Sequence, residues 1–248
     1  MTTNVLLAVL IFVAALLYSS VGHGGASGYL AAMALFNISP AIMKPTALVL
    51  NLFVAGVGTV RYARAGCFAW NIFWPFALLS VPFAFKGGSW NLPVHVYKII
   101  LGLVLLFAAW RLALRQSAHT PPIQKPVVLP WALVLGAAIG LLSGLTGVGG
   151  GIFLSPLLLL LGWADIRKAA GVSAAFILVN SAAGLLGQMS QGHGIESLPQ
   201  EIFWWVPVAL VGGLIGAELG SRRLTPLVMR RLLAAVLVVA GLKMLLTR

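Results

Sequence analysis

The sequence predicts an all-α fold, a polytopic transmembrane helical bundle made of two inverted repeats, each with a short broken or re-entrant glycine-rich helical hairpin. The first observation behind this fold class is composition. Apolar residues make up 60% of the 248 residues, charged residues make up 8%, and the mean hydropathy is +1.03. A soluble domain carries about a quarter charged residues, so the outer surface of this chain must face lipid. The other two observations are a succession of apolar segments and an order of motifs that occurs twice.

Ten apolar segments follow one another along the chain. Eight are long enough to approach the roughly 20 residues that a spanning helix needs, and the second and seventh are short. The segments are 5–21, 26–36, 41–60, 68–86, 94–114, 129–146, 151–162, 166–188, 202–220 and 226–246. The first has neither a positive charge before it nor a small-residue cleavage site after it, so we expect it to be retained. These segments leave no room for a soluble domain.

A polar connector, 115–128, separates a first transmembrane repeat, 1–114, from a second, 129–248. The run Gly22-His23-Gly24-Gly25 in the first repeat corresponds to Gly147-Val148-Gly149-Gly150 in the second, and Gly66 corresponds to Gly192. Each repeat then continues with a proline-containing helix, a Gly-Ser turn and a final helix. We expect the connector to be a cytoplasmic linker.

Basic residues predict the orientation. With the N-terminus outside, eleven of the 16 Lys and Arg residues fall at inner ends, as is usual for cytoplasmic loops. They are Arg61, Arg64, Arg111, Arg115, Lys125, Arg167, Lys168, Arg222, Arg223, Arg230 and Arg231. Each repeat crosses an odd number of times whether its short segment spans or re-enters, so the second repeat is inverted. We expect both termini on the non-cytoplasmic side of a bacterial inner membrane. Because the net charge of +12 is scattered between apolar runs, we expect no nucleic-acid binding.

The two glycine-rich runs carry the functional prediction. Each lies between a long and a short apolar segment, and irregular backbone at membrane depth is tolerated only inside protein or beside a wet cavity. Glycine leaves backbone N–H groups open to a ligand, and the helix that follows points its positive N-terminal end at the same place. Two such helix starts, related by inversion, are expected to converge on an anion near the midplane. The alternative is that the glycines only permit close helix packing.

The same runs resemble a known family. Gly-His-Gly-Gly-Ala-Ser-Gly-Tyr-Leu at 22–30 and Gly-Val-Gly-Gly-Gly-Ile-Phe-Leu-Ser-Pro at 147–156 resemble the paired glycine motifs of the sulfite exporter TauE/SafE family, as do the chain length, the half-repeat and the turn 220–224. The resemblance covers nearly the whole chain. It implies transport of sulfite or an organosulfur anion such as a sulfonate, without indicating which.

Polar side chains near the runs are further candidates, each with a structural alternative. Hydroxyls beside the turns either donate to an anion or bond the carbonyls of their own helix, and the amides of Asn51 and Asn180 either line a pathway or brace helices. His23 either bonds an anion, carries a coupling proton or is structural. The expected substrate-binding residues are Ser20, Gly22, His23, Gly24, Gly25, Ser27, Asn51, Ser143, Thr146, Gly147, Gly149, Gly150, Gly151 and Asn180.

No enzyme signature is found in the sequence: no His/Cys metal-ligand pattern, no carboxylate to complete a triad near His23, and no nucleotide-phosphate loop. We therefore expect no cofactor and no metal. Of the four acidic residues only Glu218 lies inside a segment, at helix-pair spacing from Arg222. The expected function is secondary transport of a small anion by alternating access, one half rocking against the other. A transporter of an unrelated metabolite or ion and a non-transporting membrane subunit remain alternatives, and a homodimer is left open.

Overall fold

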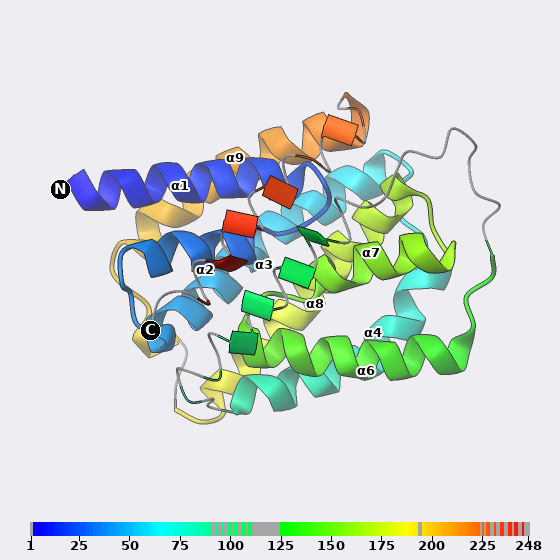
Figure 1. Ribbon diagram of the computed structural model, residues 1–248, viewed down its shortest axis with the longest axis horizontal. Helices are drawn as coiled ribbons and strands as arrows, with labels where there is room; N and C mark the ends of the chain where they lie inside the picture. The colour runs from blue at the N-terminus through cyan, green and yellow to red at the C-terminus, as the bar shows by residue number, and fades with distance from the viewer. Residues whose placement is uncertain are drawn as a thin grey trace.

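The computed structural model describes residues 2–90, 125–192 and 195–223, with scattered positions between 93 and 110 and between 225 and 245. These residues form eight α-helices and one short 3-10 helix and contain no strand (Figure 1). The elements are α1 (Thr2–Ser19), α2 (Ala26–Leu35), α3 (Pro40–Arg64), α4 (Trp70–Ser89), α6 (Leu129–Thr146), α7 (Gly151–Leu161), α8 (Ile166–Met189), η1 (Ile195–Ser197) and α9 (Ile202–Arg222).

The described helices confirm eight of the ten expected segments to within a few residues. By length and composition, α3, α6, α8 and α9 are candidate membrane spans. The two short segments are helices of 10 and 11 residues, α2 and α7, as expected. The segments 94–114 and 226–246 and most of the connector lie largely outside the described residues, as do His95, His119 and His193.

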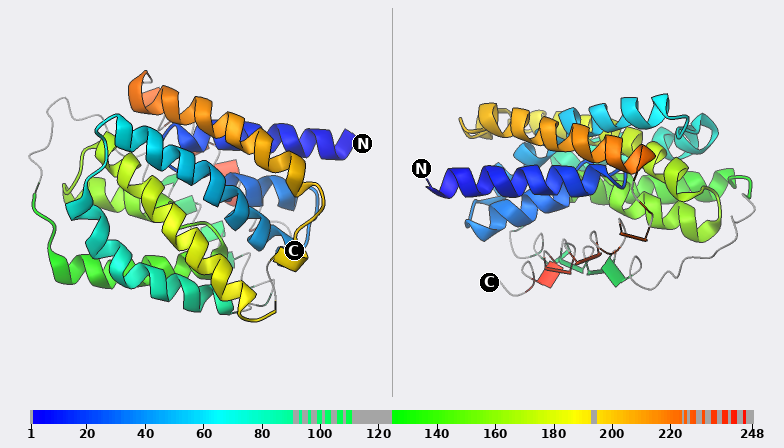
Figure 2. Two further views of the ribbon diagram at one scale, coloured as in Figure 1. Left: turned by 180° about the vertical axis from the view of Figure 1, so that it is seen from behind. Right: turned by 90° about the horizontal axis from the view of Figure 1, so that it is seen from above.

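Helices α3 and α8 form the antiparallel centre of the bundle, between α1 and α9 on one side and α4 and α6 on the other (Figure 2). Contacts fix their register. Asn51 donates to Ser181 Oγ at 3.2 Å. A Cβ on Gly58 would lie 3.6 Å from that of Ala174, and one on Gly184 would lie 3.6 Å from Leu48. From one pair to the next, the residue number rises on α3 by the same amount that it falls on α8, as in regular antiparallel packing.

The outer helices pack through glycines, and each pairs with a helix of the other half. Glycines spaced four residues apart on α6 lie against backbone carbonyls of α4, and a second such row on α9 lies against carbonyls of α1. Small residues at this spacing let helix backbones approach closely. The contacts are Gly136, Gly140 and Gly144 with Phe76, Ser80 and Ala84, and Gly212, Gly216 and Gly220 with Phe12, Leu16 and Ser20. The fourth helix of each half is therefore packed on the first helix of the other.

Side-chain contacts define the two ends of the bundle. At one, which we call the N-terminal end, Asn4 donates to Glu201 at 3.3 Å, where α1 and α9 begin. At the other, the linker end, α3 and α9 finish and Glu218 pairs with Arg61 at 3.3 Å and with Arg222 at 3.4 Å. The expected helix pair between Glu218 and Arg222 is thus present.

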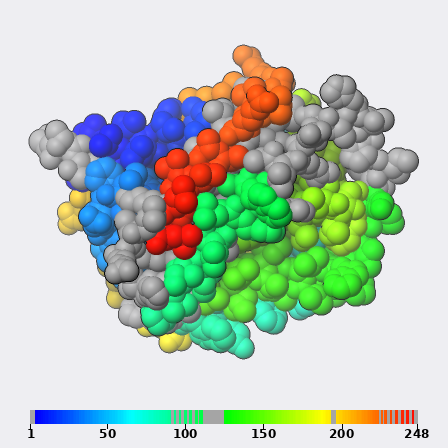
Figure 3. All heavy atoms as spheres, viewed as in Figure 1, coloured from blue at the N-terminus to red at the C-terminus, as the bar shows by residue number. Residues whose placement is uncertain are grey.

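Described residues of the segments 94–114 and 226–246 lie side by side on one face (Figure 3). A Cβ on Gly102 would lie 2.7 Å from Leu245, and one on Gly241 would lie 2.8 Å from Leu106. The last segments of the two halves therefore meet each other, as α3 and α8 do.

Candidate functional site

The first glycine-rich run joins α1 and α2 into a hairpin. The two helices are antiparallel, with Gly28 against Ala14, and α1 runs parallel to α9. Gly25, which precedes α2, has φ 101°, and Gly150, which precedes α7, has φ 81°. Both angles lie in the left-handed region that favours glycine. The chain therefore turns sharply at these glycines, and each short helix begins inside the bundle.

The two glycine-rich runs meet at the side chain of Asn51. A Cβ on Gly24 would collide with Asn51 Oδ1, and one on Gly149 would lie 2.7 Å from Asn51 Nδ2. Ile177 of α8 touches both glycines from the opposite side, at 3.1 and 2.7 Å from the same Cβ positions. Asn51 and Ile177 stand near the middles of α3 and α8. The two runs therefore meet beside the middles of the central helices, and we call this meeting point the glycine junction.

Carbonyl oxygens of the glycine junction are already hydrogen-bonded. Asn51 Nδ2 donates to Val148 O at 3.4 Å, Tyr29 OH donates to Gly24 O at 2.8 Å, and His23 Nε2 lies 3.0 Å from Gly151 O. The oxygen of Gly25 accepts from Tyr29 N–H in the first turn of α2, and the oxygen of Gly150 accepts from Phe153 and Leu154 N–H in the first turn of α7. Side chains and helix starts thus occupy these backbone carbonyls, whereas Asn51 Oδ1 has no partner among the described residues.

Backbone N–H groups at the junction are left open. Among the described residues the backbone amides of Gly24, Gly25, Gly149 and Gly150 have no backbone acceptor, and all four residues are buried. Buried polar groups in native proteins nearly always have a partner. Occupied carbonyls beside open N–H groups favour an anionic ligand over a cation.

His23 links the two hairpins. Its ring reaches from the first run to the carbonyl of Gly151 at the start of α7, and Nδ1 has no partner among the described residues. A neutral ring with the proton on Nε2 satisfies the contact to Gly151 and leaves a bare acceptor at Nδ1. Uptake of a second proton would turn that acceptor into a donor.

Sequence comparisons identify the family of this chain. The family model described as Sulfite exporter TauE/SafE matches residues 7–244. The chain belongs to the sulfite exporter TauE/SafE family. It is 44% identical over 242 residues to the probable membrane transporter protein y4hK of Sinorhizobium fredii, covering 96% of this chain and 97% of that one. The resemblance seen in the sequence is confirmed.

More distant relatives cover most of the chain as well. A probable membrane transporter protein of Methanocaldococcus jannaschii, MJ0441, is 27% identical over 97% of this chain and 95% of its own. The probable membrane transporter protein YunE of Bacillus subtilis is 23% identical over 84% of this chain and 82% of its own. No solved structure matches. The names of the family and of its members indicate a membrane transporter rather than an enzyme.

The hydroxyls near the glycine runs of this TauE/SafE family member differ in whether they already have a hydrogen-bond partner. Ser20 donates to Leu17 O and Thr146 to Leu142 O, both at 2.7 Å, so these two bond their own helices. Ser143 Oγ has no partner among the described residues. Ser27 lies beside the Tyr18 hydroxyl. Of these candidates, Ser143 keeps a hydroxyl free for a ligand.

Asn180 is not brought to the glycine junction. Its Oδ1 accepts from Ser80 of α4, and its Nδ2 donates to Phe176 O of its own helix at 2.8 Å. Its side chain therefore braces α8 against α4. The residue that occupies the position corresponding to Asn51 is Ile177, which touches the same two glycines.

Two contacts define how the halves correspond. Gly22 lies against the backbone of Ala170 in α8, and Gly147 lies against the backbone and Cγ of Lys44 in α3. An offset of 126 relates Lys44 to Ala170 and also Asn51 to Ile177. The two halves thus make the same backbone contacts around the junction with different side chains.

Lys44 is one of the five basic residues that the expected orientation does not place at inner ends. The structure buries it, with 8% of its surface exposed, and its ammonium donates to Gly88 O at 3.3 Å and Trp90 O at 3.4 Å. The signal in the sequence is a lysine placed four residues inside an apolar run, between Pro40 and Leu48, instead of at its border.

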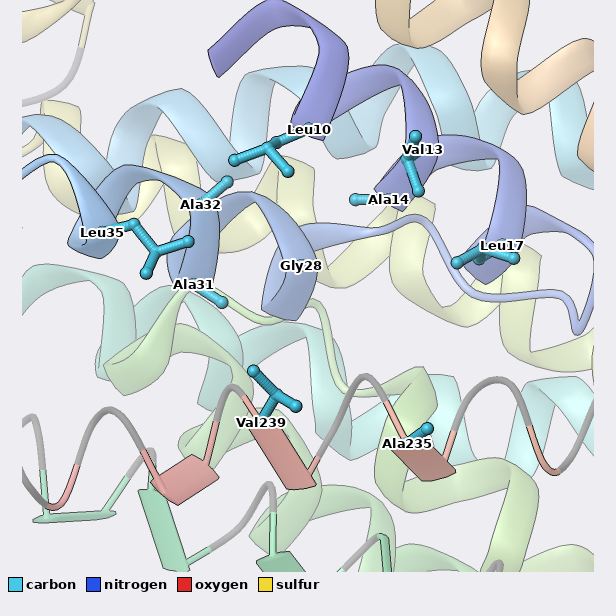
Figure 4. Close-up of a pocket in the computed structure, with 10 residues that line it drawn as sticks. All are labelled: Leu10, Val13, Ala14, Leu17, Gly28, Ala31, Ala32, Leu35, Ala235 and Val239. Carbon is cyan, nitrogen blue, oxygen red and sulfur yellow. The ribbon is translucent and has the colours of Figure 1, made fainter. Parts of the chain in front are cut away.

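Two cavities lie away from the glycine junction. One of about 340 Å³ opens between α1, α2 and the last segment (Figure 4). Only apolar side chains and Gly28 line it, so it offers nothing to hold an anion. The other, of about 300 Å³, lies at the linker end and is lined by Asn71, Lys125, Trp163 and Lys168 among others. Within the described part of the chain, no group of three His, Cys, Asp or Glu residues is placed to hold a metal ion.

Proposed function

We propose that this protein is a secondary transporter of a small sulfur-containing anion, such as sulfite or a sulfonate, and that the glycine junction is its binding site. The observation that carries the proposal is the meeting of two buried glycine runs with occupied carbonyls and open N–H groups. Oxyanion oxygens are strong acceptors that suit converging backbone donors. The family name supplies sulfite as the first anion to test.

Transport of a metal cation is disfavoured by the same contacts. A cation would need carbonyl or carboxylate oxygens, but the carbonyls of Gly24, Val148 and Gly151 already face hydrogen-bond donors. The four acidic residues stand at or near the ends of the bundle: Asp165, Glu196, Glu201 and Glu218.

The two hairpins are proposed to be inverted, re-entrant elements. Three directions of packing support this: α2 returns along α1, α1 runs parallel to α9, and α6 runs parallel to α4. In this arrangement α1 and α2 enter from the N-terminal end, whereas α6 and α7 enter from the linker end. By the positive-inside tendency, the basic residues Arg61, Arg64 and Lys168 support a cytoplasmic position for the linker end.

We propose that alternating access moves two rigid bodies, each made of helices from both halves. The glycine rows join α4 to α6 and α9 to α1, so rocking 1–114 against 129–248 would break both interfaces. Bodies made of α1, α2 and α9, and of α4, α6 and α7, keep those interfaces intact. They would slide on the central pair α3 and α8.

Flux of sulfite into proteoliposomes containing the purified protein tests the function. Transport is expected with the wild-type chain and is expected to fall to background when Gly25 and Gly150 are both replaced by valine, because both positions have a positive φ and precede the short helices. Absence of flux from the wild-type protein for sulfite and sulfonates, with a constant copurifying partner, would instead indicate a non-transporting subunit.

Orientation is tested by labelling single cysteines in a Cys67→Ser background. Asn4→Cys lies at the N-terminal end and Arg64→Cys at the linker end, and both positions are exposed. A membrane-impermeant maleimide added to intact cells stripped of their outer membrane is expected to label the first and not the second. The opposite pattern would reverse the proposed topology.

A further inference from the structure

Lys44 and Gln188 face each other on the N-terminal side of the glycine junction. The register of α3 and α8 pairs Asn51 with Ser181 and Leu48 with Gly184. One helical turn further on, the same register places Gln188 opposite Lys44. A second set of contacts agrees: the Lys44 ammonium bonds Gly88 O, and Gly88 lies against the backbone of Gly184.

Both side chains are buried, and neither has a charged partner among the described residues. Gln188 is 5% exposed, and neither its oxygen nor its nitrogen has a partner among the described residues. All four acidic residues of the chain are in the described part, and none forms an ion pair with Lys44 there. Burying an ammonium with only neutral carbonyls as partners costs free energy. An arriving anion would offset this cost.

The corresponding place on the linker side has a different chemistry. The offset of 126 relates Lys44 to Ala170 and Gln188 to Tyr62. Ala170 has no polar side chain, and the Tyr62 hydroxyl lies 2.9 Å from Ser20 O and 3.2 Å from Ser19 O, to which it donates. At these corresponding positions the hydroxyl is therefore paired, and neither residue is basic. Of the four compared positions, only Lys44 has a basic side chain.

We propose that Lys44 and Gln188 form a charge-selective subsite that binds the oxygens of the anion on the N-terminal side of the glycine junction. Gly147, the first glycine of the second run, packs against the Lys44 stem, so an anion held here lies next to the junction. The ammonium supplies the charge, and the amide of Gln188 supplies two directed N–H donors. This inference rests on the proposed function and names the residues that select for negative charge.

The test measures sulfite binding and sulfite flux for four proteins in nanodiscs and proteoliposomes. They are the wild type, Lys44→Met, Gln188→Leu and Lys86→Met. Lys86 is a matched control because it lies near the same end, is exposed, and sits over the Trp90 ring at 5.6 Å. We expect Lys44→Met to weaken sulfite binding by at least roughly tenfold and Gln188→Leu by about threefold to tenfold. Lys86→Met is expected to bind as the wild type does.

Thermal unfolding without ligand separates binding from a structural role. If Lys44 only holds the end of α4 through Gly88 and Trp90, Lys44→Met will lower the melting temperature while leaving sulfite affinity unchanged, and the subsite is then wrong. Sulfite binding to the wild-type protein without sulfite flux would contradict the transport proposal but would still support the subsite. Wild-type protein with neither binding nor flux for sulfite or ethanesulfonate would overturn both.

Discussion

The two glycine runs make the same backbone contacts but carry different chemistry. Gly22 and Gly147 each pack on a central helix, and Gly24 and Gly149 each touch Asn51 and Ile177. The first run adds His23 and is braced by Tyr29, whereas the second has Val148 in place of the histidine and lies against Lys44. A histidine ring therefore belongs to one run, and a lysine side chain stands beside the other.

The repeat therefore preserves backbone geometry but not side chains. Backbone donors need only the turn and the helix start, which both runs provide. Binding a charge and transferring a proton need particular side chains. One lysine and one histidine are enough when both runs form a single site.

The largest effect is expected from closing the junction at Gly24. Gly24→Ala puts a methyl group against Asn51 Oδ1, and a displaced Asn51 loses its contacts to Val148 and Ser181. We expect sulfite flux into proteoliposomes to fall by tenfold or more. This corresponds to the free energy of roughly one charge-assisted hydrogen bond. The control Gly56→Ala meets only Leu178 at 3.8 Å and should transport normally. Full activity of Gly24→Ala would remove Asn51 from the site.

The two intramembrane amides should separate into a ligand residue and a brace. Asn51→Leu is expected to lower flux about tenfold, because the shared contact of both runs is lost. Asn180→Leu is expected to keep flux within about threefold and to lower the free energy of unfolding by about 1–3 kcal/mol, because Ser80 loses its acceptor. Flux and melting temperature measured on both variants check this. Equal flux losses would contradict the distinction.

His23 is expected to show a smaller effect that depends on the replacement. Glutamine keeps a donor for Gly151 O but cannot titrate, so His23→Gln should retain flux within about threefold, whereas His23→Ala should lose more because Gly151 O is left unbonded. Flux is measured for both at pH 6 and pH 8. A wild-type pH dependence that disappears in His23→Gln would assign the coupling proton to this ring.

The smallest effect is expected at the linker end. Glu218 pairs with Arg61 and Arg222, and the three side chains are 36–60% exposed. Exposed ion pairs contribute about 0–1 kcal/mol, so Glu218→Gln should leave flux unchanged and shift the melting temperature by no more than a few degrees. A large loss of flux would show that this cluster takes part in the motion between the two bodies.

Much of the fold followed from hydropathy. The limits of eight helices were predicted to within a few residues, because a chain in lipid must satisfy its backbone inside helices and expose apolar side chains. The glycine runs were also predicted to meet, since two broken segments at equivalent places point to one site. The exchange of α4 and α9 between halves was not predicted, because hydropathy marks spans but not their neighbours.

A helical membrane protein of the TauE/SafE family with two glycine runs could be recognised from the amino-acid sequence alone. These features are local, set by composition, periodicity and conformational freedom. Only the tertiary structure decided which polar groups share a site: it brought Asn51 and not Asn180 to the glycine junction, and it buried Lys44 opposite Gln188. Which face of a helix meets which neighbour depends on the register between residues far apart in the chain. That register cannot be read from the local pattern of a single sequence.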